Sequence, residues 1–256
     1  MNQSKKNIFR FSLGRNKYDN QPAQCTATDF DDFVSQISNT GSTRKGQTFI
    51  CAPLKTGNHS DSSKYPGIGH WRIHELALPR SYIALDGDYF ANSSVFTDFQ
   101  SEISQWSAMV YTTASHSPSA PRARAIIELN REIDRTEGIA LGESIERMLT
   151  SKLGSGNITL DPTVYRAEQP VYTPLVGAQI SRYHGQPLDV SAVLAAFPAP
   201  VPSKAASASA ISTTNPEFQI TGGYLESLDV VNGSVGELSE VEITITGGVL
   251  VEDVTP

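Results

Sequence analysis

The amino-acid sequence predicts an α+β domain followed by a β-rich or disordered acidic tail. Short apolar runs of strand length alternate irregularly with stretches in which apolar residues recur every three or four positions. A segment rich in Pro, Ala and Ser interrupts this pattern near residue 200, and acidic residues outnumber basic ones beyond it. An irregular mixture of strands and helices is typical of mixed or antiparallel sheets flanked by helices.

The Pro, Ala and Ser segment divides the chain into three predicted parts. Residues 1–198 form the main domain, 199–214 a linker and 215–256 the acidic tail. The linker is expected because small residues and Pro contribute little to a core. In the tail, apolar residues alternate over 218–221 and 241–246, and each run leads into a Gly-Gly pair. The tail is therefore expected to be β-rich if it folds.

Charge and composition exclude several classes of protein. Of 20 basic and 27 acidic residues, residues 203–256 hold one and eight, which leaves 19 of each for residues 1–202. The main domain is neutral, which allows a local basic groove without indicating one. No apolar run approaches the roughly 18 to 20 residues that span a bilayer, and no secretory signal opens the chain. We expect a cytoplasmic protein with no membrane partner.

Zinc is not expected either. The chain has two cysteines, Cys25 and Cys51, whereas a structural zinc site takes about four Cys or His ligands. Cys51 lies in an apolar run and is interpreted as a small buried hydrophobic residue.

Helices and strands can be predicted in order along the main domain. A helix over 28–37 has apolar residues on one face and Thr28 as its expected N-cap. Apolar strands follow at 81–86, 108–113 and 124–129, and the last two are expected to form a hairpin-like pair. A second helix lies between Thr136 and Lys152, with Gly154 at its C-terminal cap, and a strand over 157–161 ends on an acid.

Two carboxylates stand at the end of the first of these strands. Asp86 and Asp88 are two residues apart, so the period of a strand places both on one face. Carboxylates gathered on one face repel each other unless a cation lies between them, and Mg²⁺ is bound by carboxylate oxygens together with substrate phosphates. The alternative is a solvated Asp-Gly turn between two strands.

A polar loop with one histidine precedes the 124–129 strand. His116 is followed by Arg122 and Arg124, which are also two residues apart. Histidine can donate to a phosphate oxygen, and arginine binds phosphate through two parallel hydrogen bonds. The alternative is a loop histidine beside two arginines on a solvated strand edge.

The order of these motifs resembles the archaeo-eukaryotic primase superfamily, in particular the primase-polymerase domains of plasmid and phage replication proteins. Leu85-Asp86-Gly87-Asp88 is similar to the acid-x-acid motif of that family, Ala114-Ser115-His116 to its small-x-His motif and Leu160-Asp161 to its hydrophobic-acid motif. The resemblance implies a primase-polymerase catalytic fold. It also implies that Asp86, Asp88 and Asp161 bind two Mg²⁺ or Mn²⁺ ions.

The resemblance further implies a catalytic role for His116 and for the three carboxylates, and nucleotide binding by Ser115, His116, Arg122 and Arg124. The expected function is a template-dependent DNA primase or polymerase of plasmid or phage replication in a bacterial host. Its expected partners are nucleoside triphosphates, single-stranded or primed DNA, and a helicase or other replication protein. The alternative is a catalytically inactive protein of the same fold that binds single-stranded DNA. Ala114, where the family often has a hydroxyl residue, favours that alternative.

Overall fold

The structure, a computed structural model, describes residues 8–43 and 46–199 in full and, further on, the strands 217–221, 224–230, 241–246 and 249–253. The chain divides into two compact units, Met1–Ala199 and Pro200–Pro256. Residues 200–214, which make up most of the predicted linker, lie outside the described residues.

The first unit begins with a small antiparallel sheet in the order β10-β3-β1-β2. The hairpin β1–β2 pairs Phe11 with Cys25, and β10 reaches β3 from a distant part of the chain, placing Tyr172 opposite Thr48. Cys51, directly after β3, is buried as the sequence predicts. The bounds of these strands are β1 (Phe9–Gly14), β2 (Ala23–Ala27), β3 (Thr48–Ile50) and β10 (Pro170–Tyr172).

Helix α1 (Phe30–Ser38) covers this sheet and confirms the first predicted helix. Its N-cap is Asp29, whose carboxylate accepts from the backbone N–H of Asp32 at 2.9 Å, so the prediction of Thr28 is wrong by one residue. The backbone N–H of Thr28 donates instead to the Asp32 carboxylate, which fixes the chain just before the cap. The buried face of α1 joins the aromatic core, where the Phe33 ring lies 4.5 Å from that of Tyr82.

A larger antiparallel sheet in the order β11-β7-β8-β6-β9 carries the predicted apolar strands. The predicted hairpin-like pair is confirmed, because β7 and β8 are antiparallel with Val110 opposite Ala125. Strand β6 lies next to β8 and is buried over most of its length. The bounds are β6 (Arg80–Phe90), β7 (Ser107–Thr112), β8 (Ala123–Ile133), β9 (Ile158–Leu160) and β11 (Ile180–His184).

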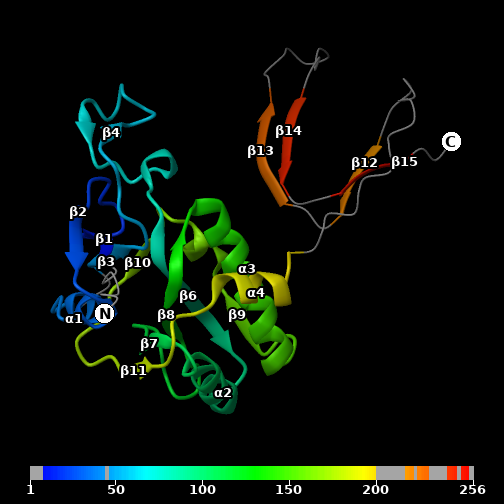
Figure 1. Cartoon of the computed structure of the whole chain (residues 1–256). Coiled ribbons are helices and arrows are strands. Elements are labelled where there is room, and N and C mark those ends of the chain that lie inside the picture. Colours follow the sequence, from blue (N-terminus) through cyan, green and yellow to red (C-terminus); the bar gives the residue numbers. More distant parts are fainter. Residues whose placement is uncertain are drawn as a thin grey trace, which may run out of the picture. The chain divides into compact units, whose positions relative to one another are not determined.

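Helices α2 (Ser93–Ile103), α3 (Arg135–Leu153) and α4 (Val190–Ala196) pack beside this larger sheet (Figure 1). Helix α3 confirms the second predicted helix, and Gly154 ends it with a φ of 93°, a conformation that favours glycine. Shorter elements are β4 (Gly57–Asn58), β5 (Ile68–Gly69), and the single 3₁₀ turns η1 (His74–Leu76) and η2 (Pro162–Tyr165).

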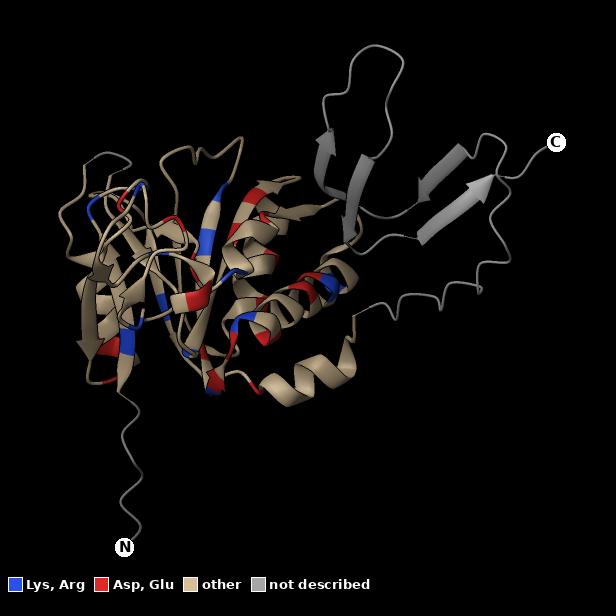
Figure 2. Ribbon diagram, turned by 90° about the horizontal axis from the view of Figure 1, so that it is seen from above, with Lys and Arg blue, Asp and Glu red and all other residues tan. Residues whose placement is uncertain are grey.

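The predicted α+β class is confirmed, and all the strand pairs described are antiparallel. Basic and acidic residues are interspersed over the ribbon of the first unit (Figure 2). In the second unit, β12 (Glu217–Thr221) pairs with β15 (Val249–Asp253), and β13 (Tyr224–Val230) pairs with β14 (Val241–Thr246). Among the described residues, we find no helix with the length and apolarity needed to cross a membrane.

Candidate active site

Asp86 and Asp88 lie within strand β6, which continues to Phe90. Gly87 between them is opposite both Ala123 of β8 and Leu160 of β9, so the Asp-Gly turn considered as an alternative is not present. A Cβ on Gly87 would stand 2.5 Å from the Phe90 ring and 3.1 Å from the Ala123 carbonyl oxygen. A residue without a side chain is therefore required at this position of a packed sheet.

Asp161 directly follows β9, the strand beside β6. Its backbone N–H donates to the Asp86 carbonyl at 2.9 Å, which sets the two residues opposite each other across the strands. The Asp161 carboxylate caps η2, because it accepts from the backbone N–H of Thr163 at 2.9 Å and from the Thr163 hydroxyl at 2.8 Å. The strands thus bring together the backbones of all three predicted acids.

Arg124 neutralises Asp86 from the neighbouring strand. The two residues are opposite each other in β8 and β6, and Nε and Nη2 of Arg124 donate to Asp86 Oδ2 at 2.9 and 2.5 Å. The Arg124 guanidinium also lies 5.7 Å from the centre of the Tyr172 ring, and the Tyr111 hydroxyl donates to the Tyr172 carbonyl at 2.6 Å. Both tyrosines help to hold Arg124 against Asp86.

The second carboxylate oxygen of Asp86, Oδ1, does not contact Arg124. Asp86 is 6% exposed, and its Oδ1 is buried with no hydrogen-bond partner among the described residues. Burial raises the pKa of Asp86, the Arg124 charge opposes that rise, and the nearby carboxylates of Asp88 and Asp161 add to it. A buried carboxylate oxygen without a donor, close to two further acids, is an environment that would favour a cation.

Asp88 and Arg122 form the exposed side of the same site. Arg122 Nη1 is 3.4 Å from Asp88 Oδ1, and both side chains are about half exposed. Such a pair contributes little to stability, so either partner can exchange it for a ligand. Arg122, just before β8, contacts Asp88, and Arg124 within β8 contacts Asp86. The alternative of a purely solvated strand edge does not hold for Arg124, whose side chain is 12% exposed.

His116 belongs to the loop between β7 and β8. Its Nδ1 accepts from the backbone N–H of Arg122 at 3.1 Å, which assigns the proton of a neutral ring to Nε2. The ring lies 5.6 Å from that of Phe96 and lines a hollow of about 250 Å³ together with Thr112, Thr113 and the segment 175–179. Ser115 is exposed in the same loop.

The side chains are not arranged as a closed metal cage. Among the residues that the structure describes, no group of three or more His, Cys, Asp or Glu side chains is arranged to hold an ion. Sequence reasoning also missed three residues that shape the site. Thr163, two residues after Asp161, follows a common capping pattern and could have been noticed, whereas Tyr111 and Tyr172 lie in apolar or distant segments without a local signal.

The fold and the site define an α+β domain with two acids on one strand and a third at the end of the neighbouring strand. Residues 67–197, just over half of the chain, match the VapE N-terminal domain family, and the chain belongs to that family. The match includes all seven predicted site residues.

Among solved structures, the chain is similar to the AEP domain of the primase-polymerase of cyanophage S-2L. The two are 10% identical, the similarity covers 75% of this chain and 90% of that one, and the TM-score is 0.41. No curated protein matches the sequence.

Proposed function

We propose that this chain is a template-dependent nucleotidyltransferase, a DNA primase or polymerase that joins nucleoside triphosphates. It would act in plasmid or phage replication in the cytoplasm of a bacterial host, together with a helicase or another replication protein. The observation that carries the proposal is the unpartnered, buried Oδ1 of Asp86, with Asp88 two residues along the strand and Asp161 opposite.

The donor set fits hard divalent ions. Asp86, Asp88 and Asp161 would hold two Mg²⁺ or Mn²⁺ ions, since all three offer carboxylate oxygens. Asp86 has one oxygen without a donor, and Asp161 keeps lone pairs beyond those that Thr163 occupies. When bound, two such ions lower the pKa of the attacking 3′-hydroxyl and neutralise the leaving phosphates.

Arg124, Arg122 and His116 have different roles at the triphosphate site. Arg124 is held by Asp86 and Tyr172, so it fixes the orientation of Asp86. The Arg122 side chain is about half exposed and makes one long contact, to Asp88, so it can turn to the phosphates. His116 presents its Nε2 proton to a phosphate oxygen, and the Ser115 hydroxyl is exposed in the same loop.

The test is extension of a labelled primer on a DNA template by the full chain, with Mg²⁺ or Mn²⁺ and with ribonucleotides or deoxyribonucleotides. We expect wild type to extend the primer and Asp161→Asn to reduce extension by at least about 100-fold. Asp98→Asn is the matched control, because Asp98 is an exposed acid on α2 outside the site. Failure of wild type to start or extend a strand with either metal would sink the proposal.

A second candidate has support of its own. The Asp86–Arg124 pair and the Asp161–Thr163 contacts stabilise these acids without any ion, which suits a protein that retains the fold and binds single-stranded DNA without catalysis. That candidate predicts salt-sensitive DNA binding that is indifferent to metal and to nucleotide. Metal-dependent incorporation of nucleotides would exclude it.

A further inference from the structure

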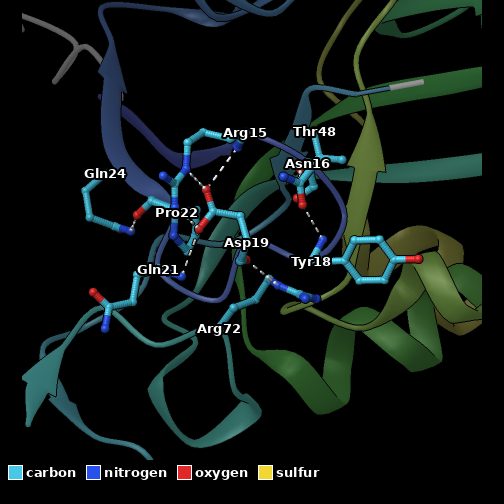
Figure 3. A network of polar contacts seen from close by, with 9 residues as sticks. All are labelled: Arg15, Asn16, Tyr18, Asp19, Gln21, Pro22, Gln24, Thr48 and Arg72. Carbon is cyan, nitrogen blue, oxygen red and sulfur yellow. Dashed lines mark hydrogen bonds and ion pairs between the residues drawn. The ribbon is translucent and has the colours of Figure 1, made fainter. Parts of the chain in front are cut away.

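A loop of the small sheet and the segment that carries the β4–β5 pair are joined into one surface. The loop between β1 and β2 approaches the segment that contains β4 and β5, and Arg72 ties them together (Figure 3). Its Nε donates to the Asp19 carbonyl at 3.0 Å, its Nη2 donates to the Lys17 carbonyl at 3.0 Å, and its backbone N–H donates to the Asn20 carbonyl at 2.8 Å. The conformation of the β1–β2 loop is therefore fixed from within the protein.

Asp19, the acid in the β1–β2 loop, receives its hydrogen bonds from residues of the same loop. The Asp19 side chain is 4% exposed and accepts from the backbone N–H and Nε of Arg15 at 3.0 and 2.9 Å and from the backbone N–H of Gln21 at 3.1 Å. The hydrogen bond from Arg15, with the backbone hydrogen bonds, lowers the pKa of Asp19 although burial opposes this. The side chain of Arg15 remains 86% exposed, so the loop presents its cation to solvent and keeps its anion inside.

Aromatic rings with cations beside them line the same surface. Tyr18 is 76% exposed, and the Lys17 ammonium lies 4.9 Å from the centre of its ring. The Tyr65 ring lies 5.7 Å from that of Trp71, and the Lys64 ammonium lies 5.3 Å from Tyr65. Tyr18, Tyr65 and Trp71 border a common hollow of about 370 Å³. We call Arg15, Lys17, Tyr18, Lys64, Tyr65 and Trp71 the Tyr18 surface.

This combination matches the chemistry of an unpaired nucleic-acid strand. Exposed rings offer platforms on which bases stack, and cations next to those rings contact the phosphates between them. A duplex hides the faces of its bases and could use only the cations. We propose that the Tyr18 surface binds single-stranded DNA, with a base stacked on the exposed ring of Tyr18 and phosphates held by Arg15, Lys17 and Lys64. The Tyr65 ring, which packs against His59 at 4.4 Å and against Trp71 at 5.7 Å, forms the wall of the hollow beside it. The inference rests on the proposed function in one respect, that the bound strand is the template.

The Tyr18 surface is connected to the carboxylate site through the sheets. Gly14, at the start of the β1–β2 loop, is opposite Thr48, which is in turn opposite Tyr172. Tyr18 and, to a smaller extent, Tyr172 raise the pKa of Lys17. Because Tyr172 also contacts Arg124, a strand that crosses the Tyr18 surface can continue towards Asp86.

The test is the binding of a fluorescent 16-nucleotide oligo(dT) to the full chain, measured by anisotropy over a range of salt concentrations. Tyr18→Ala should weaken binding by about five-fold or more, because stacking on one ring is lost. Tyr18→Phe keeps the ring and should bind within about two-fold of wild type. The double variant Lys17→Ala/Lys64→Ala should reduce the slope of log affinity against log salt by about 1.4.

Arg131→Ala/Lys152→Ala removes two partly exposed cations elsewhere and is the charge-matched control. The inference is overturned if wild type does not bind oligo(dT), if a duplex of the same length binds as tightly, or if Tyr18→Ala binds like wild type. Primer extension separates this result from the proposed function. If binding depends on Tyr18 but the chain does not extend a primer, DNA binding by the Tyr18 surface is supported and the proposed enzyme function is rejected. If the chain extends a primer and Tyr18→Ala has no effect at limiting template, the enzyme function is supported and template binding by the Tyr18 surface is rejected.

Discussion

The carboxylate site and the Tyr18 surface use charge in opposite ways. In the site, Asp86 and Arg124 are buried in packed strands. Arg124 contacts one oxygen of Asp86 at 2.5 Å, and the other oxygen has no donor among the described residues. On the Tyr18 surface, the cations and a tyrosine ring face solvent, and the acid Asp19 is turned inward. A reaction requires charges fixed in one geometry, whereas a strand of variable sequence requires exposed rings that accept any base.

The largest effect that this comparison predicts is a separation of catalysis from binding. Asp86→Asn keeps the shape of the side chain but removes the charge, so primer extension should fall by about 1,000-fold while oligo(dT) affinity stays within about two-fold of wild type. Extension and anisotropy on the same preparation would measure this. Equal losses in both assays would show that the two regions are one site.

A smaller effect is expected when the support of Asp86 is altered. Arg124→Lys keeps the charge but loses the two-nitrogen contact to Oδ2 and the planar contact with Tyr172. The rate at saturating nucleotide should fall by about 10- to 100-fold. A melting temperature close to that of wild type would show that the loss is not due to unfolding, and a wild-type rate would contradict the role given to Arg124.

Substitution of two glycines tests whether the carboxylate site is packed more tightly than the segment next to the Tyr18 surface. Gly87→Ala would push a Cβ against the Phe90 ring and the Ala123 carbonyl, so the free energy of unfolding should fall by about 3 kcal/mol. Gly67, in the segment between β4 and β5, has a φ of 91° and open space around it, so Gly67→Ala should cost about 1 kcal/mol from the backbone alone. Urea denaturation would measure both, and equal costs would refute the contrast.

The smallest predicted effect depends on pH. The pKa of Asp19 is lower in the folded protein than its ordinary value. Its carboxylate therefore stabilises the fold above that ordinary value, near pH 4, and the contribution is lost as the pH falls through the folded-state pKa. Asp19→Asn should lower the free energy of unfolding by roughly 1 kcal/mol at pH 7 and by less near pH 3. A difference that grows on acidification would have the wrong sign.

The elements nearest the site were the easiest to predict from sequence. Continuous apolar runs marked β6, β7 and β8, and the acids at 86, 88 and 161 stand at or near the ends of such runs. Helix α2 was not predicted, although its N-cap Asn92 and the buried residues Val95, Phe99 and Ile103 were signals that could have revealed it. Local patterns therefore indicated most of the larger sheet and the order of the acids.

The surroundings of the acids could not be predicted because they depend on contacts between distant segments. Strand β10 brings Tyr172 to Arg124 through pairing with β3, and nothing in the local sequence of either strand indicates that pairing. The burial of one Asp86 oxygen follows from the whole sheet. In the same way, the Tyr18 surface exists only because Arg72 ties two loops together.

The central claim is that Asp86, Asp88 and Asp161 bind divalent metal ions. The most direct measurement is a titration of the full chain with Mn²⁺, followed by electron paramagnetic resonance in the presence of a non-hydrolysable nucleoside triphosphate. We predict two bound ions per chain in wild type, and a loss of both or of the tighter one in Asp86→Asn, while Asp98→Asn behaves like wild type. Nucleotide alone binds Mn²⁺, so the count is made after subtracting a nucleotide-only titration. Equal Mn²⁺ binding by wild type and Asp86→Asn would contradict the account.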